Sequence, residues 1–426
     1  MKRNIQLMTS LVWMTAFFWG FSFQGEQEKY REYRGTVVDA ANGKALALAS
    51  ISVAGSNIST VSNTEGEFRL KIPQSALNGQ VVVSFLGYEN KTIPIGELKQ
   101  NANIALNVSF TKLSGVNLNA PKDAEALVRE VLLKRGENYS GTNTVMTAFY
   151  RETIKKRRKN VSLSEAVVNI YKAPYFSNRN DAMKLYKARK STDYSKLDTV
   201  ALKLQGGPFN TLYVDIMKYP EFIFVDGTVD EYEFKFERST YIDDRLIYVI
   251  EFSQLPVIRE PLYKGKLYID VENKTLTSAI YKLNITNKDL AARLFVRKKP
   301  AKVDVWPTEV AYRVDYRERN GKWYYSYSNV LMEFKVDWKG KLFNSVYSMA
   351  AEMAITDWKT NTSGEVPKNK EKIKRSIILS DENIGFTDPD FWGQYNIIEP
   401  EKSIESAIKK IQRQLRRANK SGAPAR

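Results

Sequence analysis

The sequence predicts a mainly β protein in which a small N-terminal sandwich precedes a large antiparallel β-domain with a few helices. Short runs of alternating apolar and polar residues, separated by turn-forming residues, recur along most of the chain, as expected of half-buried strands. Segments with helical spacing of apolar residues are few. A length of 426 residues favours two or three domains, and a hydrophobic content of 43% is ample for a packed core.

The first 22 residues have the features of a secretory signal peptide. Lys2 and Arg3 supply positive charge, and an uncharged apolar run from Leu7 to Phe21 follows them. Small residues at the end of this run predict cleavage before Phe23, and an uncleaved N-terminal anchor is the alternative. We therefore expect an exported protein that lies in the periplasm or is associated with the outer membrane.

Residues 32–113 have the pattern of the sandwich. Thr36–Val38 is apolar and β-branched, and Ala49–Ala54 alternates between apolar and small residues. A turn at Asn63–Gly66 precedes a further alternating run at Phe68–Ile72. Short strands separated by turn signals in this way are typical of a sandwich.

Several motifs in this segment resemble the carboxypeptidase regulatory-like, or transthyretin-like, domain. The resemblance implies a seven-stranded sandwich without a catalytic role, in an exported protein of Gram-negative bacteria. In such envelope proteins the domain often precedes a receptor or another binding module. The motifs are Gly35-x-Val37-x-Asp39, Gly43-Lys44-Ala45-Leu46, Ala49-Ser50-Ile51-x-Val53-x-Gly55, Ser59 to Phe68 with Asn63 and Glu65 in place of the usual acids, and Ser84-Phe85-Leu86-Gly87-Tyr88.

A linker at Asn119–Asp123 leads into the large β-domain, which we place at residues 123–400. Asp123 is expected to cap a helix that ends near Arg135. Asn320-Gly321 is a strong signal for a two-residue hairpin. Alternating strands are predicted at Tyr232–Phe236, Leu246–Phe252, Leu267–Val271, Val310–Tyr316 and Val330–Trp338.

Each of these strands has one apolar face, so the sheet must bury that face against something. Only two clear helices, near Leu127 and Ile408, are available to cover it. The sheet is therefore expected either to form an open, half-barrel-like cradle or to close on itself. In agreement with a cradle, Tyr263–Asp270 resembles the hairpins of periplasmic lipoprotein-carrier half-barrels.

The order of motifs along the chain also resembles envelope proteins that carry the same first domain. The segments concerned are Asn138-Tyr139, Phe149–Glu152, Ser164–Val168 and the closing motif Phe391–Pro400. This resemblance implies a location in the envelope and no established activity.

Residues 401–426 are predicted to form a basic helix and tail. Apolar residues recur there at helical spacing, and we expect the helix to dock on the sheet, with peripheral contact to a membrane as the alternative. A second basic cluster, Lys155–Lys159, is typical of a solvated hairpin tip. The apolar positions of the terminal helix are Ile404, Ile408, Ile411 and Leu415.

The chain contains no cysteine and no histidine. Disulfides, thiol nucleophiles, Ser-His-Asp triads and the usual zinc sites are therefore excluded. We predict no catalytic, cofactor-binding or metal-binding residues, and we expect that the protein is not an enzyme.

Four other groups of residues resemble sites but are expected to be structural. Gly206-Gly207-Pro208 lacks the Lys-Ser/Thr of a phosphate loop and predicts a turn. The acidic clusters Asp226, Asp230, Glu231 and Asp388, Asp390 lack calcium-loop spacing and lie beside turns. Aromatic residues that could line a ligand surface, but that are expected to pack in the core, are Trp306, Trp323, Tyr324, Tyr325 and Trp338.

Three functions remain compatible with the sequence. The leading hypothesis is a non-enzymatic binding or assembly protein of the cell envelope, whose partners are envelope proteins, an apolar ligand or a glycan. A periplasmic carrier with an apolar cradle is the second, and a carboxylate-based glycoside hydrolase is the third. A formal net charge of +17 is compatible with anionic partners, although solvated surface charge is the expected interpretation of it. Nucleic acid is not expected among them.

Overall fold

The structure of the chain is a computed structural model that describes residues 29–109, 123–157, 159–192, 205–224, 229–242, 245–296, 299–340, 342–379 and 392–401. Four predicted features lie outside these ranges: the signal segment at 1–22, the linker at 119–122, the helix after residue 401, and the acidic residues Asp226, Asp388 and Asp390. Within the described residues, no helix is both long and apolar enough to cross a membrane.

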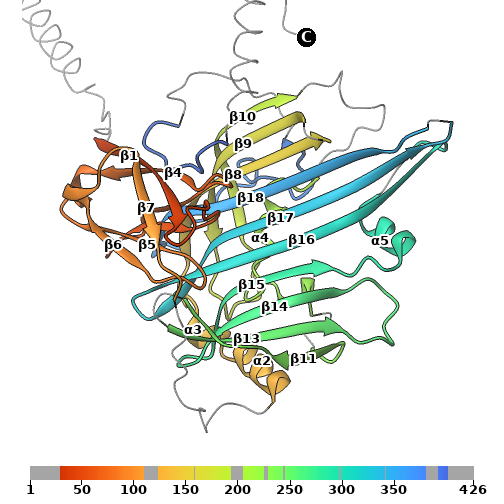
Figure 1. Cartoon of the computed structure of the whole chain (residues 1–426), viewed down its shortest axis with the longest axis horizontal. Helices are drawn as coiled ribbons and strands as arrows, with labels where there is room; N and C mark the ends of the chain where they lie inside the picture. Colours follow the sequence, from red (N-terminus) through yellow and green to blue (C-terminus); the bar gives the residue numbers. More distant parts are fainter. Residues whose placement is uncertain are drawn as a thin grey trace, which may run out of the picture.

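The N-terminal region is a sandwich of seven strands in two sheets, as predicted (Figure 1). One sheet has the order β4-β1-β7 and the other the order β3-β2-β5-β6, and their inner faces share an apolar core around Val37, Phe68 and Ile104. Two 3-10 turns, η1 (Gln74–Ala76) and η2 (Ile95–Glu97), connect strands. The strands are β1 (Tyr30–Asp39), β2 (Ser50–Val53), β3 (Ser59–Val61), β4 (Glu67–Pro73), β5 (Gln80–Ser84), β6 (Lys91–Pro94) and β7 (Ala102–Leu106).

The remaining strands form one antiparallel sheet, which confirms the predicted large β-domain. Its order is β10-β9-β8-β18-β17-β16-β15-β14-β13-β11, with β12 also paired to β13. The final strand β18 lies between β8 and β17 in the middle of the sheet. The strands are β8 (Thr144–Lys156), β9 (Lys159–Lys172), β10 (Ala182–Thr192), β11 (Tyr232–Phe236), β12 (Thr240–Ile242), β13 (Arg245–Gln254), β14 (Tyr263–Asp270), β15 (Thr275–Leu283), β16 (Val303–Arg319), β17 (Lys322–Trp338) and β18 (Ser345–Thr360).

Two local predictions are confirmed in this domain. Asp123 caps helix α2 (Ala124–Leu133), because its side chain accepts a hydrogen bond from the backbone N–H of Ala126 at 3.0 Å. Asn320 and Gly321 turn the β16–β17 hairpin with φ angles of 52° and 74°. Such left-handed values are what a type I′ turn requires.

A β-bulge in β17 sets which of its aromatic residues face the core. Trp323 and Tyr325 pack in the same cluster as Val330. In a regular strand, these odd-numbered residues and Val330 would face opposite sides of the sheet. Ser326 is the extra residue, since Tyr325 and Tyr327 pair with adjacent residues of β16. The bulge therefore keeps the inner face apolar along the whole strand and turns Tyr327 to the opposite face.

The inner face of the sheet is covered by α2 and by residues 205–224, which lie behind the sheet in Figure 1. The 205–224 segment begins with the predicted turn at Gly206-Gly207, continues through α4 (Phe209–Leu212) and ends with η4 (Pro220–Phe222). The sequence indicated only the turn here, because the apolar residues of this segment follow neither a helical nor a strand period. Those that are buried include Phe209, Leu212, Val214, Ile216, Met217, Tyr219, Ile223 and Phe224.

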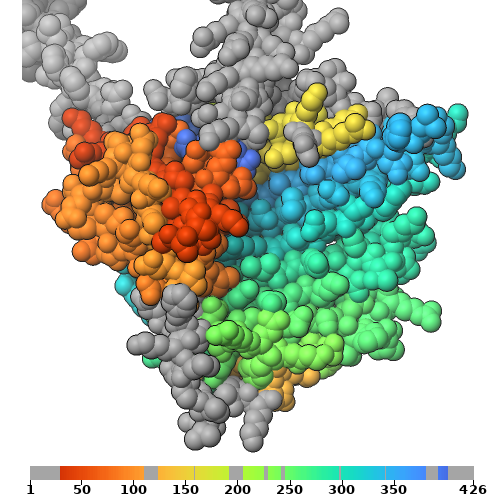
Figure 2. All heavy atoms as spheres, viewed as in Figure 1, coloured from red at the N-terminus to blue at the C-terminus, as the bar shows by residue number. Residues whose placement is uncertain are grey.

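The sandwich packs on the outer face of the large sheet, beside β18 (Figure 2). Ser59 Oγ donates a hydrogen bond to the carbonyl of Ile355 at 3.0 Å. The closing segment 392–401 lies between the two regions, where Trp392 meets the ring of Phe149 edge-on at 5.4 Å. Two further short helices are α3 (Arg135–Asn138), which contacts α2, and α5 (Lys288–Phe295), which contacts β16.

Candidate functional site

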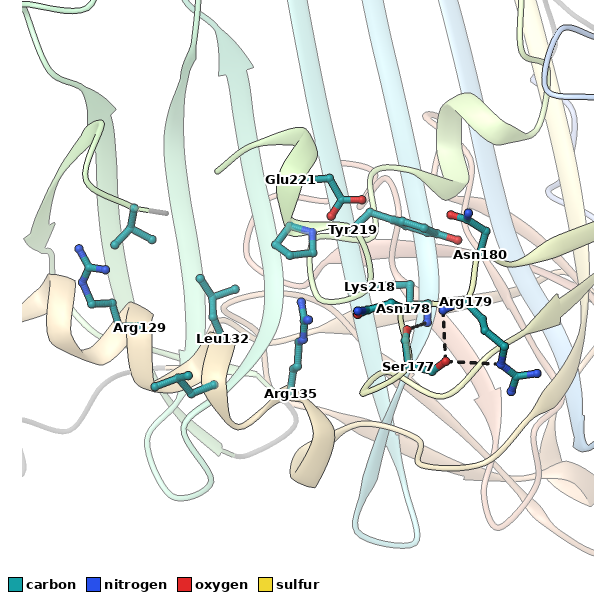
Figure 3. Close-up of a pocket in the computed structure, with 13 residues that line it drawn as sticks. Arg129, Leu132, Arg135, Ser177, Asn178, Arg179, Asn180, Lys218, Tyr219 and Glu221 are labelled. Carbon is teal, nitrogen blue, oxygen red and sulfur yellow. Dashed lines mark hydrogen bonds between the residues drawn. The ribbon is translucent and has the colours of Figure 1, made fainter. Parts of the chain in front are cut away.

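A cleft of about 700 Å³ opens beside the inner face of the sheet (Figure 3). Helices α2 and α3 form one wall. The loop at 177–180 and the turn at 218–221 form the other. Its lining combines basic, amide and apolar side chains: Arg129, Leu132, Leu133, Arg135, Ser177, Asn178, Arg179, Asn180, Lys218, Tyr219, Pro220, Glu221 and Val229.

Three cations in this lining have no carboxylate partner among the described residues. Lys218 donates to the backbone carbonyls of Pro174 and Ser177, at 2.8 and 2.6 Å. The Arg179 guanidinium donates to the side-chain oxygen of Asn143 at 2.9 Å. Arg135 extends from the α3 wall toward Pro220 and Lys218 (Figure 3). The cleft therefore presents positive charge that the surrounding described chain does not neutralise.

The ammonium group of Lys218 is held in an unusual state. Burial lowers its pKa to about 8, and the neighbouring charges of Lys172 and Arg135 act in the same direction. The carboxylates of Asp181 and Asp215 oppose this effect but do not cancel it. An anion placed in the cleft would stabilise the charged form and raise this pKa again.

Arg129 differs from these three cations although it lines the same cleft. It forms an ion pair with Glu125 one turn earlier on α2, at 2.7 Å, and a second with Asp230. Glu221 is the one carboxylate among the described lining residues. A two-carboxylate mechanism of the glycosidase type is therefore not available to the described lining of this cleft.

Apolar side chains lie next to the cations. Leu133 is 84% exposed at the end of α2, and Leu132, Pro220 and Val229 line the cleft beside it. An exposed leucine by itself is common on protein surfaces. Together with the unpaired cations, these side chains give the concave site both an apolar and a positively charged surface.

A buried charge cluster beneath the cleft holds the walls in place. Lys172, at the end of β9, donates to Asp181 at 2.9 Å and lies 2.7 Å from a carboxylate oxygen of Asp215. Asp215 also accepts hydrogen bonds from the hydroxyls of Tyr175 and Tyr316, at 3.0 and 2.9 Å. Because all of these side chains are buried, the cluster ties the 173–181 loop and the 215–219 segment together as one unit.

As far as the structure describes them, the other residue groups considered in the sequence do not assemble into a site. Asp230 lies at the surface and is paired with Arg129, and the acidic residues of the described chain do not form a group of three or more that could hold a metal ion. The five aromatic residues are divided between places. Trp323 and Tyr325 are buried on the inner face, and Trp338 packs against the same cluster while partly buried. Tyr324 stacks on Trp358 with ring centroids 4.9 Å apart, and Trp306 lies under Lys288.

The cleft residues were not predicted from the sequence. Arg135, Arg179 and Lys218 are far apart along the chain, and none belongs to a motif. One signal was present: Lys172 falls at an inward position of a strand whose neighbours on that face, Ile170 and Val168, are apolar. A charged residue in an apolar row indicates a buried partner.

Comparisons with known proteins bear on the first domain. Residues 33–119 match the family model of the CarboxypepD_reg-like domain. No curated protein matches the chain.

Three solved structures show a distant likeness. One is a DUF1329 family protein from Desulfovibrio piger, with 10% identity, coverage of 57% of this chain and 95% of that one, and a TM-score of 0.25. Another is a putative outer membrane lipoprotein-sorting protein domain from Vibrio parahaemolyticus, with 10% identity, coverage of 58% and 95%, and a TM-score of 0.24. Lipovitellin has 5% identity, coverage of 55% and 27%, and a TM-score of 0.26.

TM-scores this low carry no inference about the ligand of this chain. The match to the first domain is direct, because it covers all seven strands except the first three residues of β1. Residues 33–119 are therefore a CarboxypepD_reg-like domain, joined here to a large antiparallel sheet that carries the cleft.

Proposed function

We propose that this protein is a non-catalytic binding protein of the cell envelope, and that its cleft holds an amphiphile through an anionic group. The observation that carries the proposal is the set of three cations, Arg135, Arg179 and Lys218, without carboxylate partners among the described residues of a cleft of about 700 Å³. The envelope location rests on the signal-like N-terminus, which includes Lys2 and Arg3.

The chemistry of the lining supports binding rather than catalysis. Arginine and lysine side chains recognise carboxylate and phosphate groups through charge-assisted hydrogen bonds. Leu132, Leu133 and Val229 offer an apolar surface for an acyl chain next to these cations. The described lining holds a single carboxylate, Glu221, so it lacks a matched acid and base.

The proposal predicts that affinity depends on the unpaired cations. Lysophosphatidylglycerol is the probe, and a monoacylglycerol with the same acyl chain is the uncharged comparison. Arg135→Ala should weaken binding of the anionic lipid by about 10- to 100-fold, since a hydrogen bond to a charged group contributes about 1.5–3 kcal/mol. Isothermal titration calorimetry measures both affinities.

Arg129→Ala is the matched control, because Arg129 lines the same cleft but is neutralised by Glu125 and Asp230. Its effect should be under about threefold, as expected of a charge already screened by two partners. Equal losses in Arg135→Ala and Arg129→Ala, or equal affinity for the charged and uncharged lipids, would exclude the proposed site.

A further inference from the structure

The central strands of the large sheet run out to a projecting end (Figure 1). Strands β16, β17 and β18 are 16 or 17 residues long, and the turn between β17 and β18 forms the tip. At this turn Leu342 is 94% exposed and Phe343 is 78% exposed. No described part of the chain covers either side chain.

The same end gathers basic residues from three separate segments. Strand pairing sets Lys156 opposite Tyr347, and the backbone N–H of Arg157 donates to the carbonyl of Val346 at 2.8 Å. The basic β8–β9 hairpin tip therefore lies beside the start of β18. On the other side, the N–H of Lys339 donates to the carbonyl of Lys302 at 3.0 Å, which joins the start of β16 to the tip.

Five exposed cations result from this arrangement, and none of them has an ion-pair partner among the described residues. Two described acidic residues lie opposite each other near the start of β16. Asp304 is paired with Lys299, and Asp337 lies opposite it on β17. The surplus at this end is therefore positive. The five cations are Arg157, Lys159, Lys302, Lys335 and Lys339.

We propose that this end of the sheet, which we call the basic tip (Leu342 and Phe343 with the five cations), docks on an anionic lipid surface. Leu342 and Phe343 enter the boundary between headgroups and acyl chains, and the cations contact lipid phosphates. An apolar point surrounded by lysine and arginine is what such a surface requires, because burial of apolar area and attraction to anionic headgroups add together.

The composition of the apex separates this partner from nucleic acid. Binding to a single strand rests on aromatic side chains that present their faces to successive bases. The tip has one exposed aromatic ring, Phe343, next to an aliphatic side chain, Leu342. A pair of this kind is suited to insertion between acyl chains and offers no row of stacking platforms.

The basic tip is independent of the cleft. Lys159 and Lys172 are the two ends of β9, and the cleft lies past the Lys172 end. A strand of this length separates them by about 40 Å. Binding of a single amphiphile in the cleft and docking of the tip on a bilayer can therefore be tested separately.

The test measures binding of the chain from residue 23 onward to vesicles. Vesicles of phosphatidylglycerol with phosphatidylethanolamine are compared with vesicles of phosphatidylcholine alone. The triple variant Lys302→Glu, Lys335→Glu, Lys339→Glu should lose about 100-fold or more in affinity for the anionic vesicles, because each cation near such a surface contributes about fivefold. Leu342→Ser with Phe343→Ser should lose about tenfold or more.

Matched controls carry the same changes elsewhere. Lys264→Glu, Lys282→Glu and Lys359→Glu alter the net charge equally at exposed positions away from the tip. Val257→Ser replaces an apolar residue that is 78% exposed, as Phe343 is. All controls should bind within about threefold of the unaltered chain, and thermal unfolding should be unchanged in every variant, as expected of exposed positions.

A second readout follows insertion directly. Because the chain has no cysteine, Phe343→Cys carries a single environment-sensitive dye. Its emission should shift to the blue with anionic vesicles, and the same dye at Val257→Cys should not respond. Retained vesicle binding in both tip variants, equal binding to neutral vesicles, or tip-dependent binding of an oligonucleotide in place of vesicles would overturn the proposal.

Discussion

Two buried charge clusters lie on opposite faces of the same strand, β9, and they serve different parts of the molecule. On the inner face, Lys172 joins Asp181 and Asp215 beneath the cleft. On the outer face, Glu165 lies between Arg151 and Arg189, at 2.7 and 2.6 Å, beneath the sandwich and the closing segment. Both sets of side chains are almost fully buried.

The two clusters differ in what they hold. The inner cluster connects two loops within the large domain, and those loops form one wall of the cleft. The outer cluster connects the sheet to residues far along the chain, since the Arg151 guanidinium also donates to the carbonyl of Ile398 at 2.7 Å. The inner cluster therefore positions the candidate site, and the outer cluster holds the closing segment against the sheet.

In each cluster the charged partners outweigh burial in setting the pKa of the central residue, and the two clusters differ in the direction of the pKa shift. Burial alone would lower the pKa of Lys172, but the carboxylates of Asp181 and Asp215 outweigh it, so the pKa is raised. Burial alone would raise the pKa of Glu165, but the two guanidinium groups outweigh it, so the pKa is lowered. Each central charge is therefore held in place by two opposite partners, and removal of the centre leaves those partners buried and repelling each other.

Removal of the inner centre is expected to have the largest effect. Lys172→Met should lower the free energy of unfolding by about 3–5 kcal/mol, because it leaves two buried carboxylates without a cation. Urea denaturation measures this. Lys184→Met is the control: its partner Glu371 lies 2.6 Å away at the surface, and the loss should stay below about 1 kcal/mol. Similar losses in both variants would show that burial does not separate them.

Removal of the outer centre is expected to have a smaller effect that reaches further along the chain. Glu165→Gln should cost about 2–3 kcal/mol, because Arg151 keeps Glu352 at 3.3 Å and the carbonyl of Ile398. Hydrogen exchange should rise in residues 392–401 and in the sandwich strand β3. The Lys172→Met variant should show its increase at 173–181 instead. Identical exchange maps for the two variants would contradict the division of roles.

The pH dependence should also distinguish the two faces. The pKa of Lys218 is lowered to about 8, below its value in the unfolded chain, so the unfolded state binds more protons above that pH. Stability should therefore rise between pH 8 and 9.5 by up to about 1.4 kcal/mol per pH unit relative to Lys218→Met. The arginines of the outer cluster keep their charge throughout this range. Denaturation of both proteins at a series of pH values tests this. A difference in unfolding free energy between them that does not change with pH would refute it.

The smallest effect is expected at the rim of the outer face. Arg69 of the sandwich makes a two-pronged ion pair with Glu399, with nitrogen to oxygen distances of 2.6 and 2.8 Å. Arg69→Ala should cost about 1 kcal/mol, since the pair is only partly shielded from water. Proteolytic cleavage near residue 399 should become faster. Arg34→Ala is the control, because it removes an exposed ion pair in the same sandwich.

Much of the fold could be predicted because local sequence patterns specify it. The strands around Val310 and Val330 alternate in sequence, Asp123 precedes an apolar helix, and Asn320-Gly321 permits the turn that it forms. These signals arise from interactions between residues that are close along the chain. The motif residues of the first domain added its seven-strand topology through resemblance.

The cover of the inner face could not be predicted in the same way. Residues 205–224 bury Leu212 and Met217 against the sheet, but their apolar positions have no period because the segment is neither helix nor strand for most of its length. The predicted turn at Gly206 was the only local signal. An irregular segment is stabilised by whatever surface it meets, and the surface is formed by strands distant in sequence.

The sequence by itself determined the fold class, the sandwich, the alternating strands and the absence of cysteine and histidine chemistry, because these depend on composition and on short-range order. The tertiary structure alone decided the cleft, the two charge clusters on β9 and the basic tip. Each of these brings together residues from separate segments, such as Arg135 with Lys218, Glu165 with Arg189, and Arg157 with Lys302. A charge acquires its partners, its burial and its pKa only when the chain has folded around it.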